Sequence, residues 1–140
     1  MKGLLGFISI DKPAGITSHD CVNRLRRLFR IKKIGHGGTL DPAVTGVLPI
    51  AIGQATRLLP YLPKEKTYEG IIQLGLRTTT DDFQGEHIEK KAWPQLSEIE
   101  LNEHLNKFRG LIHQNPPQVS SVHIKGERAY KRVLKGEKIF

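Results

Sequence analysis

Residues 35–46 read Gly-His-Gly-Gly-Thr-Leu-Asp-Pro-Ala-Val-Thr-Gly, and an apolar segment, residues 47–52, follows directly. Four glycines and a proline within twelve residues break both helix and strand patterns, so we expect a long ordered loop. The loop lacks the Gly-Lys-Ser/Thr ending of a phosphate-binding P-loop and the spacing of the dinucleotide fingerprint. It is therefore a candidate for a functional site of another kind.

Asp41 is the candidate for chemistry in this loop. It precedes Pro42, and the residue before a proline is held extended, which can fix a carboxylate as a nucleophile or general base. The structural alternative, favoured on the residue alone, is an Asx-turn that only closes the loop. His36 can likewise either hydrogen-bond to the backbone or contact a base or phosphate. A metal site built from His19, Asp20, His36 and Asp41 is disfavoured, because the spacings match no common ligand pattern.

The segment before the loop predicts a strand followed by an amphipathic helix. Residues 4–10 are apolar and β-branched enough for a buried strand, and residues 11–15 end it with turn chemistry. Thr17 or Ser18 can cap the helix, and Asp20 lies in its first turn, where the helix dipole favours an anion. The apolar side of the helix consists of Cys21, Val22, Leu25, Leu28 and Phe29.

Positive charge is concentrated in and after this helix. The chain has 22 Lys and Arg against 14 Asp and Glu, a net charge of +8. The basic cluster consists of Arg24, Arg26, Arg27, Arg30, Lys32 and Lys33. Helical periodicity places its four arginines opposite the apolar side. Such a cluster is typical of a surface that contacts nucleic-acid phosphates, with a solvated helix face as the alternative.

Length and composition limit the class of protein. The 140 residues are 38% hydrophobic and 26% charged, which is ordinary for one globular domain and argues against a disordered tail, a fibre or a coiled coil. No apolar run approaches the roughly 18 residues of a membrane span. The apolar region at the start of the sequence is too short for a signal peptide. The single cysteine excludes an internal disulfide and fits a reducing compartment. We therefore predict a cytoplasmic protein without a membrane partner.

The segments directly after the loop predict a helix and a strand. Residues 54–62 predict a short helix, and residues 66–76 predict a strand of roughly ten residues. Tyr68 within that strand is either a core residue or a ring on which a base can stack. Residues 78–85 predict a polar connection.

The last third of the chain predicts one clear helix, residues 97–109. Ser97 and Glu100 form a capping box, and a glycine follows the last helical residue. Its expected core stripe is Leu101, Leu105, Phe108 and Ile112. Residues 119–124 predict a strand, and residues 127–134 a short basic helix or turn. The predicted fold class is α+β, with a mixed, mainly antiparallel sheet flanked by helices.

Three motifs in this order resemble those of the tRNA pseudouridine synthase B (TruB) family. The first is residues 12–20, Lys-Pro-Ala-Gly-Ile-Thr-Ser-His-Asp, and the second is the 35–48 stretch. The third is Lys66-Thr67-Tyr68 with Leu74-Gly75 and residues 78–85. Residues 119–123, Val-Ser-Ser-Val-His, depart from the Tyr-Ser-Ala-x-Lys wording common in the family.

The resemblance implies an isomerase that converts uridine 55 in the TΨC arm of tRNA to pseudouridine without a cofactor or metal. It implies that Asp41 is the catalytic aspartate, that Tyr68 packs on the target base, and that His36 contacts the substrate near the flipped nucleotide. The base must leave the stack for this reaction. Asp41 then either attacks the sugar or base, or removes a sugar proton, and the sequence leaves both routes open. The basic cluster becomes a candidate contact for the RNA backbone.

The resemblance also implies what the 140 residues represent. We expect residues 1–140 to be the N-terminal part of the catalytic domain, a pseudouridine synthase fold incomplete at its C-terminal end. The later Gly-Thr-Tyr-Ile-Arg type motif and the C-terminal RNA-binding domain are absent from the sequence. The piece alone is therefore expected to be weakly active or inactive, and a non-catalytic module that grips the tRNA elbow or aids RNA folding is the alternative. Residues 74–85 look like the stand-alone bacterial type, which implies no obligate protein partner.

Overall fold

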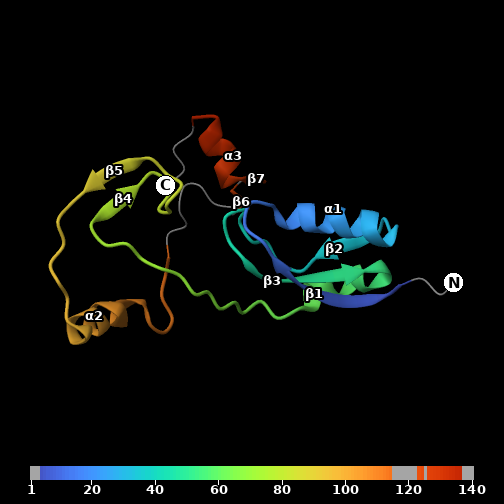
Figure 1. The fold of residues 1–140 in the computed structure, drawn as a ribbon, viewed down its shortest axis with the longest axis horizontal. Coiled ribbons are helices and arrows are strands. Elements are labelled where there is room, and N and C mark those ends of the chain that lie inside the picture. Colours follow the sequence, from blue (N-terminus) through green and yellow to red (C-terminus); the bar gives the residue numbers. More distant parts are fainter. Residues whose placement is uncertain (1–3, 115–122, 125, 137–140) are drawn as a thin grey trace. The chain divides into compact units, whose positions relative to one another are not determined.

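The chain forms two compact units, Met1–Tyr68 and Glu69–Phe140. The structure, a computed structural model, describes residues 4–114, 123–124 and 126–136, and Figure 1 shows their helices and strands along the chain. Both units combine helices with antiparallel strand pairs, which confirms the predicted α+β class. Among the described residues, no helix is long and apolar enough to cross a membrane.

The first unit is built on a three-stranded sheet in the order β1-β3-β2. β1 (Gly6–Lys12) and β2 (Ile34–His36) both pair antiparallel with β3 (Gly46–Ile52), which places Ile8 of β1 opposite Ile50. β3 is the most apolar of the three, and its central position buries both faces over Ile50, Ala51 and Ile52. The apolar segment after the glycine loop is thus the centre of the sheet.

Pro49 limits the pairing between β2 and β3. The Pro49 carbonyl accepts from Gly37 N at 2.8 Å, but proline has no N–H to return the bond. The backbone N and O of one strand residue point to the same neighbouring strand, so the ladder to β2 loses its reciprocal bond here. The chain therefore leaves the sheet after His36 and forms the loop of residues 37–45.

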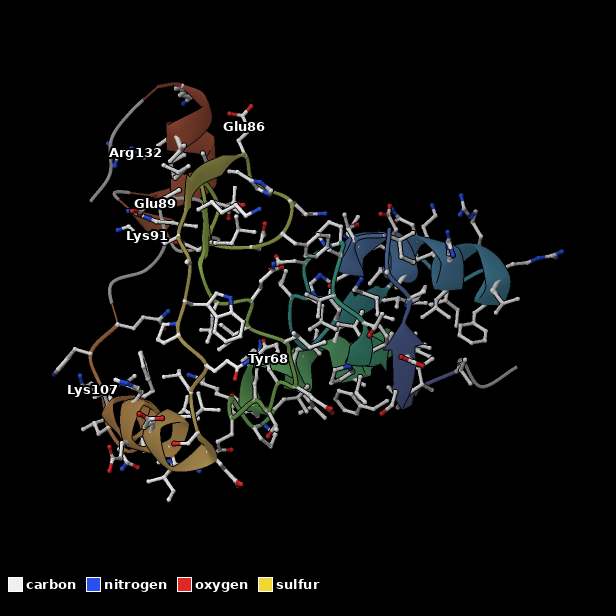
Figure 2. The ribbon with its side chains drawn as sticks, turned by 60° about the vertical axis from the view of Figure 1, so that its left-hand side comes forward. Tyr68, Glu86, Glu89, Lys91, Lys107 and Arg132 are labelled. Carbon is white, nitrogen blue, oxygen red and sulfur yellow. The ribbon has the colours of Figure 1, made fainter. Side chains whose placement is uncertain are left out.

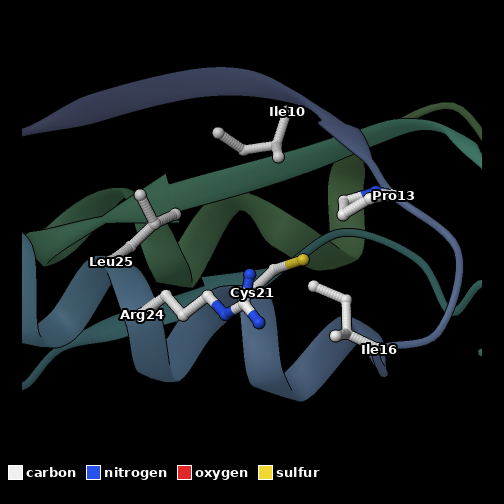
Figure 3. A pocket seen from close by; sticks show the side chains of 6 residues that line it. All are labelled: Ile10, Pro13, Ile16, Cys21, Arg24 and Leu25. Carbon is white, nitrogen blue, oxygen red and sulfur yellow. The ribbon is translucent and has the colours of Figure 1, made fainter.

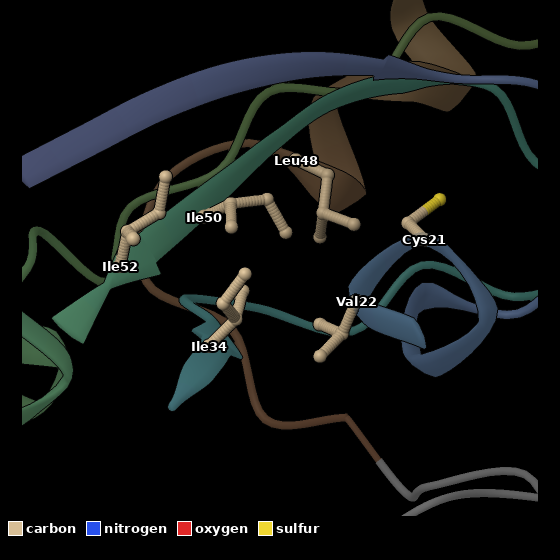
Figure 4. Packing of buried hydrophobic residues seen from close by; sticks show 6 residues of the cluster. All are labelled: Cys21, Val22, Ile34, Leu48, Ile50 and Ile52. Atoms are coloured by element: carbon tan, nitrogen blue, oxygen red, sulfur yellow. The ribbon is translucent and has the colours of Figure 1, made fainter. Parts of the chain in front are cut away.

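One face of the sheet is covered by α1 (Ser18–Phe29), as the amphipathic pattern predicts. Figure 4 shows the resulting core, which consists of Cys21, Val22, Ile34, Leu48, Ile50 and Ile52. Ile50 is fully buried and Val22 is 1% exposed. Packing of this helix on the sheet therefore fixes the position of both segments that flank the glycine loop.

The opposite face is covered by η1 (Gly53–Tyr61), a 3-10 helix where the sequence predicts a helix over residues 54–62. Because side chains alternate along a strand, Gly35 faces away from α1. A Cβ on Gly35 would lie 3.0 Å from Leu59 Cδ1 of η1, so the close approach of η1 to the sheet favours glycine there. Ala51 and Ala55 are buried in the same layer.

Lys12 joins the end of β1 to the glycine loop. Its side chain is completely buried, and Nζ donates to the carbonyls of Pro13 and Ile16 at 2.8 Å and of Pro42 at 3.3 Å. Gly15 N also donates to the Pro42 carbonyl, at 2.8 Å. A buried ammonium needs such acceptors to replace its hydration. Lys12 therefore holds the residues before α1 against the loop.

Ser18, the first residue of α1, makes a second connection to the loop. Ser18 is only 2% exposed. Its hydroxyl accepts a hydrogen bond from Leu40 N at 2.9 Å and donates one to Leu40 O at 3.2 Å. One hydroxyl thus satisfies both backbone groups of the residue that precedes Asp41.

The start of α1 has the capping box that the sequence allows. Thr17 is the N-cap, and its Oγ1 accepts from Asp20 N at 3.0 Å. In return, Asp20 Oδ2 accepts from Thr17 N at 2.9 Å and from the Thr17 hydroxyl at 2.6 Å. Both hydrogen bonds from Thr17 lower the pKa of the Asp20 carboxyl, and the bond from the hydroxyl has the larger effect.

The second unit begins with a hairpin. β4 (Leu76–Thr78) pairs antiparallel with β5 (His87–Lys90) across the polar connection predicted over residues 78–85. The predicted strand over residues 66–76 is wrong, because β4 begins only at Leu76. Residues 63–73 have no regular structure and no neighbouring strand among the described residues, and without a partner ladder a β-pattern alone does not form a strand.

The later helix has its predicted ends but not its predicted core. α2 (Glu98–Leu105) continues into η2 (Asn106–Phe108), and Ser97 with Glu100 forms the capping box. The expected core stripe is exposed instead: Leu101 41%, Leu105 37%, Phe108 70% and Ile112 46%. Capping depends on neighbouring residues in the chain, whereas burial needs a second surface, which the described residues do not supply.

The unit ends with a short hairpin and a helix. β6 (His123–Ile124) pairs antiparallel with β7 (Glu127–Arg128), and α3 (Ala129–Leu134) follows. β6 covers the last two residues of the predicted strand over residues 119–124, and residues 119–122 lie outside the described residues. The predicted short helix or turn over residues 127–134 is confirmed for its helical part.

Replacing Ser18 with alanine should lower the free energy of unfolding by about 1–3 kcal/mol, because the N–H and C=O of Leu40 lose their buried partner. Urea denaturation measures the effect. Ser9→Ala, on the exposed side of β1, is the matched control and should change stability by less than about 0.5 kcal/mol. Equal effects of the two substitutions would show that the Ser18 hydroxyl does not hold the loop.

The capping box should make stability depend on pH. Because folding lowers the pKa of Asp20, its contribution is complete above the unfolded value of 3.8 and is lost as the pH falls through the folded value. Thr17→Ala removes the hydroxyl, which is the larger cause of the shift, so its destabilisation in urea should be larger at about pH 6 than at about pH 3. Thr67→Ala, at an exposed position, should show no such difference. A pH-independent cost of Thr17→Ala would contradict the ionic part of the cap.

Candidate functional site

Asp41 lies in the loop between β2 and β3 and is fixed through both of its neighbours. Leu40 is bonded to Ser18, and the Pro42 carbonyl accepts from Lys12 and Gly15. The loop is closed by the backbone, because Val44 N donates to the Asp41 carbonyl oxygen at 3.0 Å. Asp41 itself is exposed, and its carboxylate makes no hydrogen bond or ion pair with any described residue.

The hydrogen bonds of the loop bear on the Asx-turn alternative for Asp41. In an Asx-turn the carboxylate accepts from the backbone two residues later, and no such bond is formed within the described residues. The side chain is not used to close the turn. The backbone of Asp41 is thus fixed, while its carboxylate oxygens make no hydrogen bond with the described residues. A nucleophile or general base requires such a carboxylate.

His36, the last residue of β2, is half-buried at the start of the same loop. Its Nδ1 is hydrogen-bonded to the carbonyl oxygen of Gly38. A carbonyl only accepts, so Nδ1 carries the proton, and in the neutral ring Nε2 is left as an acceptor. The backbone bond and a ligand contact are therefore compatible for His36, since each uses a different ring nitrogen.

Tyr68 is 65% exposed and lies on the stretch without regular structure that follows η1 (Figure 2). It is therefore not the core residue that a buried strand would make it, and its ring is accessible. None of the hydrogen bonds of the described residues joins Tyr68 to Asp41 or His36.

Two residues before it, Lys66 lies beside the glycine loop. A Cβ on Gly38 would lie 3.5 Å from Lys66 Nζ and 3.9 Å from Lys66 Cε. The structure thus brings Lys66, Gly38 and His36 together. Sequence reasoning missed Lys66 as a site residue, although it stands in the Lys66-Thr67-Tyr68 motif. It also missed the contacts of Lys12 and Ser18, which stand in the 12–20 motif.

The basic cluster divides into two kinds of residue. Those with exposed side chains are Arg24, Arg27, Arg30, Lys32 and Lys33. Arg26 differs from the face that helical periodicity predicts. It is half-buried and donates to Ile34 O at 3.0 Å and Asn23 Oδ1 at 3.2 Å, and its Nε has no partner. Arg26 ties α1 to β2, so the exposed arginines of α1 are Arg24 and Arg27, and Arg30 follows at its C-cap.

An apolar pocket between α1 and the end of β1 is separate from Asp41. Figure 3 shows its lining, which consists of Ile10, Pro13, Ile16, Cys21, Arg24 and Leu25. Only the cysteine and the arginine are titratable, and the cysteine is buried. The pocket therefore holds none of the acid or base candidates. Among the described residues, no group of three or more His, Cys, Asp or Glu could hold a metal ion.

Comparison with known proteins gives consistent matches. The model of the TruB family pseudouridylate synthase (N terminal domain) matches residues 26–140. The chain is 65% identical over 139 residues to tRNA pseudouridine synthase B of Synechococcus sp. (strain CC9311), covering 99% of this chain and 47% of that protein. It is 67% identical over 132 residues to tRNA pseudouridine synthase B of Prochlorococcus marinus (strain MIT 9313), covering 94% of this chain and 41% of that protein.

A solved structure supports the fold. A chain in the crystal structure of a Cbf5-Nop10-Gar1 complex matches 84% of this chain and 31% of its own length, with 31% identity and a TM-score of 0.57. The chain spans less than half the length of the two bacterial relatives. Since the family model covers most of the 140 residues, including the loop with His36 and Asp41, the chain belongs to the TruB family of pseudouridine synthases, and it matches the N-terminal domain.

Proposed function

We propose that the chain is the N-terminal part of the catalytic domain of a tRNA pseudouridine synthase that isomerises uridine 55 in the TΨC arm. The observation that carries this proposal is the Asp41 carboxylate, which is exposed and unpaired among the described residues while its neighbours Leu40 and Pro42 are anchored. A carboxylate held in this way needs little reorganisation to meet a flipped nucleotide.

The reaction breaks the bond between N1 of uracil and C1′ of the ribose and forms a bond between C5 and C1′. N1 gains a proton and C5 loses one, so the isomerisation is redox-neutral and needs no external electron carrier. Asp41 serves either as a nucleophile on the sugar or base, or as the base that removes a sugar proton. Both routes use the same exposed carboxylate.

Tyr68 and His36 are the proposed substrate contacts. The exposed ring of Tyr68 provides a surface on which the extruded uracil stacks. Stacking of a base on an aromatic ring contributes about 1–3 kcal/mol, which offsets much of the few kcal/mol that extrusion costs. His36, whose Nδ1 is bonded to the Gly38 carbonyl, offers Nε2 to the nucleotides beside the target.

The exposed basic residues are the proposed contact to the tRNA backbone. They consist of Arg24, Arg27, Arg30, Lys32 and Lys33, whereas the Arg26 guanidinium is already engaged in the bond to Ile34. Neutralising phosphates with these side chains releases counterions and gives affinity without sequence preference. A tRNA substrate fits the cytoplasmic localisation that we propose for the protein, without an obligate protein partner.

The second candidate function is a module that grips the tRNA elbow or aids RNA folding without chemistry. The observation that favours it is the exposed charge of Arg24, Arg27, Arg30, Lys32 and Lys33, which can contact phosphates without any catalytic group. In that case the exposed arginines of α1 bind RNA, and Asp41 catalyses no reaction. The 140-residue piece alone is expected to be weakly active or inactive in either case, so the deciding assay uses the complete protein.

Asp41→Asn in the complete protein should abolish turnover, because the amide can neither attack nor remove a proton. The assay uses tRNA labelled with tritium at C5 of uridine, since isomerisation releases the C5 hydrogen to water. Asp11→Asn, an exposed carboxyl in β1, is the matched control and should release tritium at the rate of the unchanged protein. Full turnover by Asp41→Asn would show that the catalytic assignment is wrong, and no release by the unchanged protein would favour the binding module.

Removing the exposed charge of α1 should weaken tRNA binding and its salt dependence. For Arg24→Gln combined with Arg27→Gln, the slope of log Kd against log salt should fall by about one for each phosphate that the protein no longer neutralises. Arg57→Gln on η1, which covers the opposite face of the sheet, is the control and should leave the slope unchanged. An unchanged slope in the double variant would refute the contact between α1 and the RNA backbone.

A further inference from the structure

Lys66 has a defined place but no protein partner. Its Nζ lies 3.5 Å from the Cβ position of Gly38, within the loop that carries His36 and Asp41. The side chain is exposed, and Nζ makes no hydrogen bond or ion pair with any described residue. A side chain at position 38 would contact the ammonium group, so glycine there keeps the approach to Nζ open. The role of this lysine is not explained by the fold.

The loop beside Lys66 offers further donors and one opposite charge. The backbone N–H groups of Gly38 and Thr39 have no acceptor among the described residues. The Gly38 carbonyl is used by His36, so at Gly38 itself only the backbone N–H is without a partner among the described residues. Asp41, three residues on from Gly38, is the loop's only carboxylate. The loop therefore has a cationic end at Lys66 and an anionic end at Asp41.

An anion is the ligand that such a cationic end fits. Uncompensated lysine ammonium groups and free backbone N–H groups are typical contacts of phosphate oxygens. A nucleotide that meets Asp41 with its sugar brings a phosphodiester within a few ångströms of that sugar on either side. Among RNA groups only the phosphodiester is anionic, whereas base edges and hydroxyls have no charge to pair with Nζ.

We propose that Lys66, with the Gly38–Thr39 backbone, binds one phosphodiester directly next to the flipped nucleotide. This inference rests on the proposed function, because it takes the RNA that meets Asp41 as the ligand. It assigns Lys66 a local role that differs from that of the basic residues of α1. Those residues bind the backbone at a distance from the target, whereas Lys66 sets the position of the target nucleotide along the loop.

The test combines a lysine substitution with neutral phosphates in the RNA. The probes are TΨC stem-loop RNAs in which each phosphate flanking uridine 55 is replaced, one at a time, by an uncharged methylphosphonate. Dissociation constants are measured for the complete protein and for Lys66→Gln, Lys66→Arg and Lys64→Gln. Lys64 is another exposed lysine, two residues earlier, and serves as the matched control. Circular dichroism checks that each variant is folded.

For the unchanged protein, one methylphosphonate should weaken binding by about fivefold, the size of an exposed charge contact. Lys66→Gln should weaken binding of the unmodified RNA by about the same factor and show no further loss at that phosphate. Lys66→Arg and Lys64→Gln should keep the full response. The proposal is overturned if no methylphosphonate weakens binding by the unchanged protein while leaving binding by Lys66→Gln unaffected. It is also overturned if Lys64→Gln loses the response to the same methylphosphonate.

The same experiment separates this proposal from the proposed function. Coupling between Lys66 and a phosphate is measured by binding and needs no turnover. Absence of tritium release by the unchanged protein would refute the isomerase while the binding data still decide the role of Lys66. Conversely, release that depends on Asp41, without coupling at any phosphate, would retain the isomerase and remove the phosphate contact of Lys66.

Discussion

The buried ammonium of Lys12 is the constraint on which the rest of the first unit depends. It collects carbonyl oxygens from the residues that follow β1 and from the loop that precedes β3. These segments are about thirty residues apart in the chain, and neither has a regular structure of its own. An unpaired ammonium in the interior costs far more than one hydrogen bond, so the segments are held together as a set. Ser18 adds a neutral contact to the same arrangement.

The sequence predicted those parts of the fold that depend on near neighbours. The helix cap at Thr17 and the capping box at Ser97 depend on residues three positions apart, and both form as expected. The strand over residues 66–76 and the core stripe beginning at Leu101 fail because each requires a partner surface that a periodic pattern cannot specify. A β-pattern states which residues can share a face, and tertiary packing decides whether that face is covered.

The candidate site shows the same division. His36 and Asp41 were named from the glycine loop and its resemblance to a family, and the structure places His36 at the end of β2 and Asp41 in the loop that follows. What the sequence could not supply is the network around them. This network joins residues far apart in the chain. Arg26 bonds to Ile34, 8 positions away, and Ser18 bonds to Leu40, 22 positions away. Lys66 approaches Gly38, 28 positions away. Charge and periodicity describe a residue's own element and not the carbonyl or glycine that another element brings to it.

Pro49 also has a consequence for the dynamics of the loop. Hairpin ladders tend to extend by adding one bonded pair after another, and a longer β2 would draw the glycine loop into the sheet. At Pro49 the next reciprocal bond lacks its donor, whatever the conformation of the residues opposite. Any further pairing would have to form beyond a position where one bond is always missing. A single imino acid in the central strand thus disfavours extension of the sheet into the Asp41 loop.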